Sequence, residues 1–421
     1  MIELPQDFVD RMRRFLGADY ENFAQSYSLP PEKGVRANTL KICAEDLPDV
    51  CPLNFDGKIP WEKNGFYVCG EGLGKTLAHA AGLYYVQEPS AMSAAPKLKA
   101  KGGERVLDLC SAPGGKGTAL AADMQGEGVL VLNEIDRKRC SVLRANVERC
   151  GVKNAVTLCR SPAQLTQTFE NYFDKILVDA PCSGEGMFKK EPNAIPEWSV
   201  DNVRRCAERQ AQILDCADKM LCGGGRLVYS TCTFAPEEDE IQVKNFLNKH
   251  PYYRLLEEDK LLPHKIRGEG HFYAVLEKID GGRAVLPYLK IKTDRTAEKL
   301  FKEFEAEYLK TDFKNLCTFD NVLYSLIDGL PEIMRSGVCL GEVINGRFEP
   351  SHTLAMCLKK EEAGCIDLDE NTAHSYLRGL TFDCADSEKG WRLATFKGFP
   401  LGWCKAVGGV AKNRLPKGLR I

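Results

Sequence analysis

Two cysteines and one aspartate stand directly after short apolar runs of the sequence. Lys175–Asp179 leads into Ala-Pro-Cys182-Ser-Gly-Glu-Gly, and Arg226–Tyr229 leads into Ser-Thr-Cys232-Thr. If both runs are strands of one parallel sheet, the loops that follow them open at the same edge, where open α/β sheets bind ligands. One cysteine among eighteen is usually a small core residue. Two at this edge with a carboxylate instead predict covalent chemistry by a thiolate.

Methylation of carbon 5 of a pyrimidine is a reaction that needs these groups. Carbon 5 of cytosine is a poor nucleophile, so a thiolate must first add to carbon 6. After methyl transfer, a base must remove the proton from carbon 5 so that the thiol can leave. Cys182, Cys232 and Asp179 are therefore the candidate catalytic residues.

A loop of small residues follows an earlier run, Arg105–Cys110, and could bind a nucleoside-containing cofactor. Neither a dinucleotide fingerprint nor a P-loop fits its spacing. Glu134, after the run Gly128–Asn133, is placed to accept hydrogen bonds from two ribose hydroxyls, and Asp136 is the second choice. The loop residues are Cys110, Ser111, Ala112, Pro113, Gly114, Gly115 and Lys116.

The elements that must position these residues alternate between strand and helix from about 105 to 229. This alternation predicts a doubly wound, parallel α/β sheet. An amphipathic helix is expected over Asp201–Leu221, ended by Gly223, and another from Pro236, with four acidic residues in its first turn. Four domains are expected: 1–80, 81–282, 283–360 and 361–421.

Composition limits the class of protein more than its function. A length of 421 residues with 44% hydrophobic and 28% charged residues is typical of a multidomain globular protein. Without a signal-peptide core or an apolar run of membrane-spanning length, we expect a cytoplasmic protein. The cysteines form no Cys-x-x-Cys pair, so we expect no metal and no disulfide framework.

The formal net charge of -2 gives no overall sign of nucleic-acid binding, but the end of the chain differs from the average. From Lys389 onward there are eight Lys and Arg residues and no Asp or Glu. This segment is either a solvated surface or a face that contacts phosphates.

Four motifs, in this order, resemble those of the RNA cytosine-5 methyltransferases, most closely the bacterial ribosomal small-subunit methyltransferase F group. They are Tyr84-Tyr-Val-Gln-Glu-Pro-Ser90, Ala112-Pro-Gly-Gly-Lys116, Asp179-Ala-Pro-Cys-Ser-Gly-Glu-Gly186 and Ser230-Thr-Cys-Thr233. The resemblance covers roughly residues 30 to 250 strongly. It implies a Rossmann-like class I methyltransferase sheet that uses S-adenosyl-L-methionine to methylate RNA, with 16S ribosomal RNA expected.

The resemblance also implies roles for single residues. Cys232 would be the nucleophile, Cys182 would help to release the product, and Asp179 would lie near the target base. Ser161 stands where the family often has an acidic contact to the cofactor. The implied cofactor contacts are Cys110, Ser111, Ala112, Pro113, Gly114, Gly115, Lys116, Glu134, Ser161 and Asp179.

The ends of the chain are expected to bind RNA. Gly34–Leu40 resembles the family's RNA-facing segment before the catalytic domain, and Gly398–Arg420 resembles its PUA-like domain. Two alternatives stay open, namely the same chemistry on tRNA and a non-catalytic ribosome-assembly factor. An amino-group methyltransferase is disfavoured because no aromatic residue follows Asp179-Ala-Pro, and a DNA methyltransferase because a second cysteine is present.

Overall fold

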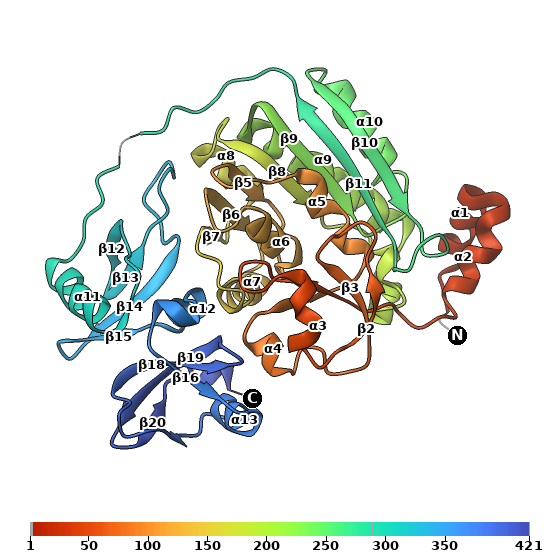
Figure 1. Ribbon diagram of the computed structural model, residues 1–421. Helices are drawn as coiled ribbons and strands as arrows, with labels where there is room; N and C mark the ends of the chain where they lie inside the picture. Colours follow the sequence, from red (N-terminus) through yellow and green to blue (C-terminus); the bar gives the residue numbers. More distant parts are fainter. Residues whose placement is uncertain (1–2, 288, 421) are drawn as a thin grey trace.

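A large mixed sheet flanked by helices forms the centre of the molecule, with smaller sheets on either side in the chain (Figure 1). The computed structural model describes residues 3–287 and 289–420. Among these residues, no helix combines the length and apolar character that a membrane span needs.

The N-terminal part combines four short helices with a four-stranded antiparallel sheet of order β2-β3-β1-β4. The register Gly34↔Gln87 pairs β4 with β1, so this sheet continues past the expected boundary at 80. Helices α1 and α2 pack through Phe8 and Phe23 against Phe234 and Trp198 of the catalytic part. The elements are α1 (Gln6–Leu16), α2 (Tyr20–Ser26), β1 (Gly34–Ala37), α3 (Leu47–Val50), β2 (Asn54–Lys58), β3 (Gly65–Cys69), α4 (Leu77–Ala80) and β4 (Tyr84–Gln87).

The central sheet has seven strands in the order β10-β11-β9-β8-β5-β6-β7. Five of them are parallel, while β10 and β11 form an antiparallel edge. Its inner strands are mostly buried and rich in Val, Leu and Ile, as expected where helices cover both faces, whereas the edge strand β10 is largely exposed. The strands are β5 (Arg105–Asp108), β6 (Val129–Asn133), β7 (Ala155–Leu158), β8 (Phe173–Asp179), β9 (Leu221–Thr231), β10 (Tyr253–Leu261) and β11 (His271–Lys278).

Two helix predictions need correction at their ends. Gly223 does not end the helix before it, because α9 stops at Met220 and β9 begins at once with Leu221. The helix expected from Pro236 begins only at Glu240, because Pro236 to Asp239 form turns that bury two of the acidic side chains. The helices are α5 (Ala94–Leu98), α6 (Gly115–Asp123), α7 (Arg137–Arg149), α8 (Pro162–Thr168), α9 (Val200–Met220) and α10 (Glu240–Lys249).

The C-terminal part contains two further sheets, of order β12-β13-β14-β15 and β16-β18-β19-β20-β17. The second sheet shares a hydrophobic cluster with the N-terminal sheet, in which Tyr376 and Leu401 join Val35 and Phe66. The elements are α11 (Arg295–Tyr308), β12 (Leu316–Phe319), β13 (Val322–Ser325), β14 (Val338–Ile344), β15 (Arg347–Pro350), α12 (His352–Cys357), β16 (Cys365–Leu368), α13 (Glu370–Leu377), β17 (Phe382–Asp383), β18 (Gly390–Phe396), β19 (Phe399–Val407) and β20 (Val410–Asn413).

Candidate active site

The two cysteines meet at the carboxyl edge of the central sheet. Strands β8 and β9 are parallel neighbours with Asp179 opposite Ser230. Cys232 follows the last residue of β9, and Cys182 lies in the loop after β8. Their sulfur atoms are 3.3 Å apart, within hydrogen-bonding distance for sulfur, and both side chains are partly exposed. Both thiols are therefore within reach of one bound molecule.

A buried polar network holds the two cysteine loops together. The hydroxyls of Ser183 and Thr233 are 2.8 Å apart and join the loops directly. The carboxylate of Glu238 accepts hydrogen bonds from the Ser183 amide at 3.0 Å and from Gln210 Nε2 at 2.8 Å. Burial raises the pKa of Glu238 to about 7. Sequence reasoning missed this residue because it placed Glu238 on an exposed helical turn.

The Cys182 thiol resists ionisation. The hydrogen bond with Cys232 and burial together raise the pKa of Cys182 well above its ordinary value. Cys182 therefore stays protonated beside the Cys232 sulfur.

Asp179, at the end of β8, has one donor on each of its two carboxylate oxygens. Lys116 Nζ lies 2.9 Å from Oδ2, and the Ser230 hydroxyl donates to Oδ1 at 2.8 Å. Burial alone would raise the pKa of Asp179, but the charge of Lys116, the neighbouring His271 and the hydrogen bonds from Lys116 and Ser230 together outweigh burial, and the pKa is lowered. The carboxylate is therefore ionised, and its side chain remains 31% exposed, within reach of a ligand.

His271 lies beside this carboxylate and was not predicted from the sequence. It is the first residue of β11, and its Nε2 is 3.7 Å from Asp179 Oδ1. Burial and the charge of Lys116 lower the pKa of His271 to about 3, so the ring is neutral. The antiparallel pairing of β11 with β9 places this residue at the site, a long-range contact that no local motif reveals.

The loop between β5 and α6 needs its glycines for packing. Gly114 has a φ of 111°, a conformation that favours glycine. A Cβ at Gly115 would lie 3.1 Å from the side chain of Gln87. A Cβ at Gly117 would lie 2.7 Å from both Leu132 Cδ2 and the Ser111 hydroxyl. A side chain at Gly115 or Gly117, in the first turn of α6, would therefore displace protein atoms around the loop.

Asp108, at the end of β5, is the clearest cofactor-site residue that sequence reasoning missed. Its Oδ2 accepts a hydrogen bond from the Ser111 hydroxyl at 2.8 Å. Its Oδ1 is buried without a hydrogen-bond partner among the described residues. Burial raises the pKa of Asp108 to about 7. A positively charged group on a bound ligand would satisfy this oxygen and favour its ionised form.

The carboxylates of Glu134 and Asp136 both have partners within the protein, and both keep acceptor positions for a ligand. Glu134 Oε1 accepts from the Asp136 amide at 3.0 Å, and Oε2 lies 3.2 Å from Arg139. A carboxylate offers about four acceptor positions, so capacity for two ribose hydroxyls remains. The Asp136 side chain instead caps α7 by accepting from the Arg139 amide at 2.8 Å.

Two other predicted cofactor residues have side chains with constraints of their own. Ser161 caps α8, where its hydroxyl takes part in a capping box with Gln164. Ser161 therefore borders the site without a free side-chain donor. Burial raises the pKa of the Cys110 thiol, so it stays neutral.

The segment Gly34–Leu40 does not offer the exposed RNA surface that was expected over its strand. All four residues of β1 are buried. Arg36 donates to Thr118 Oγ1 of α6 at 2.8 Å and also contacts Gln87 of β4. Strand β1 therefore contacts α6 and β4, next to the loop Cys110–Lys116.

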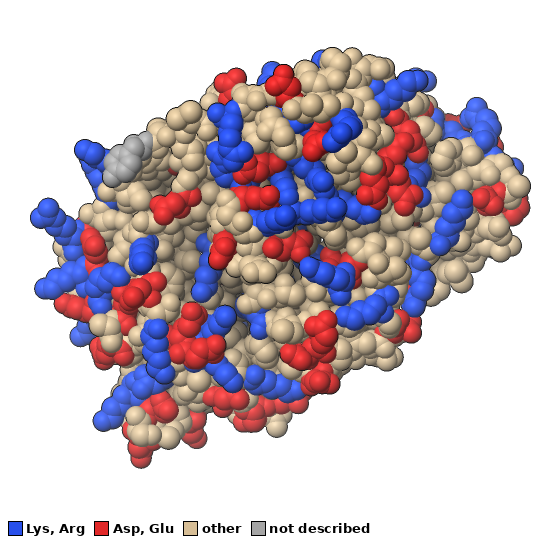
Figure 2. Space-filling view, turned by 45° about the horizontal axis from the view of Figure 1, so that its top comes forward, with Lys and Arg blue, Asp and Glu red and all other residues tan. Residues whose placement is uncertain are grey.

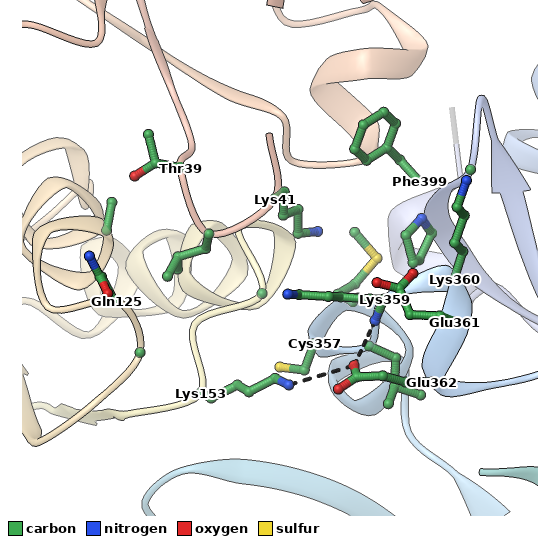
Figure 3. A pocket seen from close by; sticks show the side chains of 18 of the residues that line it. Thr39, Lys41, Gln125, Lys153, Cys357, Lys359, Lys360, Glu361, Glu362 and Phe399 are labelled. Carbon is green, nitrogen blue, oxygen red and sulfur yellow. Dashed lines mark hydrogen bonds and ion pairs between the residues drawn. The ribbon is translucent and has the colours of Figure 1, made fainter. Parts of the chain in front are cut away.

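Figure 3 shows a cavity of about 720 Å³ whose lining residues include neither Cys182 nor Cys232. Thr39 and Lys41 of the N-terminal part, Gln125 and Lys153 of the catalytic part and Phe399 of the C-terminal part line it. Because α6 begins at the cofactor loop and ends at this cavity, the two places lie at opposite ends of that helix. The cavity is therefore not the active site.

Charges of both signs alternate over the face that Figure 2 presents. Part of the acid-free C-terminal segment is engaged within its own domain, where Lys405 and Arg414 lie over the ring of Trp391 and Arg392 pairs with Glu388. Within residues 3–287 and 289–420, no group of three His, Cys, Asp or Glu side chains could hold a metal ion.

Comparison with known proteins agrees with this geometry. The family model described as 16S rRNA methyltransferase RsmB/F matches residues 95–277. The N-terminal domain of 16S rRNA methyltransferase RsmF matches 4–89, the RsmF first C-terminal domain matches 302–358, and the RsmF PUA domain matches 363–421. The ribosomal RNA small subunit methyltransferase F of Shewanella piezotolerans is 30% identical over 100% of this chain and 98% of its own length. The chain belongs to the ribosomal RNA small subunit methyltransferase F family.

Other similar proteins support the same placement. The Escherichia coli methyltransferase F is 30% identical over 99% of this chain and 97% of its own. A solved methyltransferase homolog from Pyrococcus horikoshii is 30% identical, with a TM-score of 0.60 over 66% of this chain and 96% of that chain. The structure of NSun6 from Pyrococcus horikoshii with SFG has the same TM-score at 22% identity, over 66% of this chain and 98% of that one, and shows the fold alone. The predicted family, the Rossmann-like sheet and the C-terminal PUA domain are confirmed.

Proposed function

We propose that this chain methylates carbon 5 of a cytosine in 16S ribosomal RNA, using S-adenosyl-L-methionine and a covalent adduct at Cys232. The observation that carries the proposal is the 3.3 Å approach of the Cys182 and Cys232 sulfur atoms beside the Asp179–Lys116 pair. Amino-group methylation needs no thiol. The reaction at carbon 5 needs one nucleophile and proton transfers at two stages.

The steps of the reaction can be given to residues of this site and to water. Cys232, as a thiolate, adds to carbon 6 and makes carbon 5 nucleophilic. Carbon 5 then takes the methyl group, and S-adenosyl-L-homocysteine is the leaving group. A water molecule takes the proton of carbon 5, its electron pair restores the double bond, and the bond between carbon 6 and Cys232 breaks, which releases Cys232 as a thiolate. The protonated Cys182 would assist this release by donating a hydrogen bond to the leaving sulfur.

Asp179 and Lys116 would bind the target base. The ionised carboxylate can accept a hydrogen bond from the exocyclic amine of cytosine, and Lys116 places a positive charge beside it. Negative charge that develops on the ring after thiolate addition would be stabilised by this ammonium group. The base must leave its stack to reach the thiols, so the RNA would be locally unpaired around it.

The edge formed by β5 and β6 fits S-adenosyl-L-methionine, which would supply an electrophilic methyl group. The unpaired Oδ1 of Asp108 suits the ammonium of its methionine part, and Glu134 has acceptor capacity for the ribose hydroxyls. The backbone of Cys110–Lys116 would line the same cleft, and Ser161 would border it without a free hydroxyl. With ribosomal RNA as the substrate, we expect the enzyme to act in the cytoplasm.

Isotope release and adduct trapping test this proposal. Small-subunit ribosomal RNA labelled with tritium at carbon 5 of cytosine should release tritium when the parent enzyme and S-adenosyl-L-methionine are present. Cys182→Ala should accumulate a covalent RNA adduct that denaturing gels retain, and Cys232→Ala should form none. Cys206→Ala, which removes a buried thiol of α9, serves as the control and should behave as the parent. Methylation without tritium release would refute the proposal.

A further inference from the structure

His271 is a buried polar side chain without a hydrogen-bond partner among the described residues. Its side chain is 2% exposed, and neither ring nitrogen makes a hydrogen bond. Proteins pair most of their buried polar groups, because an unpaired group has lost its bonds to water without replacement. An unpaired imidazole at a functional site therefore indicates a partner that it meets in another state of the enzyme.

The nearest acceptor is the carboxylate of Asp179. His271 Nε2 lies 3.7 Å from Asp179 Oδ1, which is too long for a hydrogen bond. Ser230 already donates to the same oxygen at 2.8 Å, and Lys116 occupies Oδ2. An oxygen with two lone pairs can accept one more bond. Hydrogen bonds of an active site are often long in the empty enzyme and shorten when substrate is bound.

We propose that His271 is a positioning residue for Asp179, to whose Oδ1 its Nε2–H donates a hydrogen bond when the target base fills the site. The inference rests on the function proposed above. With this bond, the carboxylate is held by Lys116 on one oxygen and by Ser230 and His271 on the other. Its plane is then fixed, so that it faces the base in one orientation.

The strand pairing makes a small closing movement sufficient. Strand β11 pairs with β9 through Phe272↔Thr231, so His271 stands next to the point where β9 passes into the Cys232 loop. Because β9 also carries Ser230, both donors to Asp179 Oδ1 belong to neighbouring strands of one sheet. A shift of less than about 1 Å would bring the imidazole into hydrogen-bonding range.

The charge state of His271 agrees with a donor role and not with proton transfer. Burial and the neighbouring Lys116 lower its pKa to about 3, so it is neutral throughout the range of an ordinary assay. The other titratable groups that act on Asp179 are Lys116 and, from the β5 loop, Asp108 and Cys110. His271 would therefore supply an N–H group that does not switch with pH.

Two substitutions of His271 test the inference in the full-length enzyme. His271→Phe keeps a planar ring of similar size and removes the donor, whereas His271→Asn keeps a donor. Single-turnover methylation of small-subunit ribosomal RNA should be about tenfold slower for the Phe variant, the loss expected for one active-site hydrogen bond, and partly restored by Asn. Tyr273→Phe is the matched control. Tyr273 lies on the same strand as His271, and its hydroxyl donates to Glu257 of β10, so removal of this hydroxyl should leave the rate unchanged.

Two readouts separate positioning from a structural effect. Without the donor, the pKa of Asp179 should rise, so the acidic limb of the pH–rate profile, measured at saturating S-adenosyl-L-methionine so that Asp108 does not set it, should move to higher pH in His271→Phe. The Kd for S-adenosyl-L-methionine should not change. The losses in His271→Phe and Ser230→Ala should not multiply in the double variant, because both donors act on one oxygen.

The possible failures are distinguishable. If the parent releases no tritium and forms no adduct, the proposed function fails. If the parent does both and His271→Phe keeps its rate and its acidic limb, only the role of His271 is refuted. Multiplying losses in the double variant, or an acidic limb that disappears in His271→Asn, would equally overturn the positioning role. Thermal unfolding of each variant establishes the temperature at which all of them are folded.

Discussion

The unpaired oxygen of Asp108 predicts that the affinity for S-adenosyl-L-methionine depends on pH. In the free enzyme burial raises the pKa of this carboxyl to about 7, whereas the ammonium of a bound ligand would favour the ionised form. Binding therefore selects the ionised fraction. That fraction is about one half at pH 7.0 and about 3% at pH 5.5, so the affinity should rise about fifteenfold between these values.

Isothermal titration calorimetry with S-adenosyl-L-methionine at pH 5.5, 6.0, 6.5 and 7.0 would measure this rise. The ammonium of the ligand stays protonated over this range, so its own titration contributes little. Asp108→Asn should lose the pH dependence and, at pH 7.0, bind about ten- to hundredfold more weakly, the range for a hydrogen bond to a charged group. Asp123→Asn is the matched control, because burial also raises the pKa of Asp123, at the far end of α6.

Either of two results would refute this reasoning. A parent affinity that does not change with pH would show that Asp108 does not meet a cation. A rise that persists in Asp108→Asn would place the titrating group elsewhere.

The pH dependence of stability gives an independent check that folding raises the pKa of Asp108. The pKa of Asp108 is higher in the folded state than in the unfolded chain, so between about pH 4 and 7 the folded enzyme binds more protons than the unfolded chain. The contribution of Asp108 to the free energy of unfolding therefore falls as the pH rises through this range. Asp108→Asn should unfold without this decrease, as followed by urea denaturation at several pH values.

Three further substitutions test the support of the site. Gly117→Ala should raise the KM for S-adenosyl-L-methionine at least about tenfold, because the added Cβ would lie 2.7 Å from Leu132. An unchanged KM in steady-state kinetics would contradict this packing argument. Glu238→Ala should slow the first turnover more than it weakens RNA binding, because the Ser183 amide loses its acceptor and the Cys182 loop loses a support. Equal effects on the turnover rate in rapid-quench assays and on RNA affinity in filter-binding assays would contradict this role of Glu238. Arg36→Ala should lower the free energy of unfolding by about 2 kcal/mol or more, as measured in urea, because it leaves buried partners unpaired.

Local sequence was sufficient for the catalytic strands and for the candidate residues at their ends. The predicted runs Arg105–Cys110, Gly128–Asn133, Lys175–Asp179 and Arg226–Tyr229 correspond to strands β5, β6, β8 and β9 of one sheet. They were predictable because buried parallel strands are short, continuous and apolar, and their polar residues cluster where each strand ends. This topology brings the Cys182 and Cys232 loops to one edge of the sheet, and the buried contacts between the loops then set the distance between the two sulfur atoms.

The predictions from sequence were wrong where burial, rather than the local residue pattern, determines the structure. The acidic run after Pro236 resembles a helix start, but burial of Glu238 and Asp239 keeps that segment in turns and places Glu238 under the Cys182 loop. Gly223 resembles a helix stop, yet the chain enters β9 before it. Arg36 resembles a surface cation, yet it lies inside and bonds Thr118.

The sequence by itself determined which side chains carry the proposed chemistry, because residue type and position after a strand are properties of short segments. Tertiary structure alone decided what surrounds them. The pairing of β11 with β9 placed His271 beside Asp179, and close packing left Asp108 with a buried, unpaired oxygen. Such environments depend on segments far apart in the chain. Desolvation and neighbouring charge then set which groups are ionised, and neither quantity exists until the chain is folded.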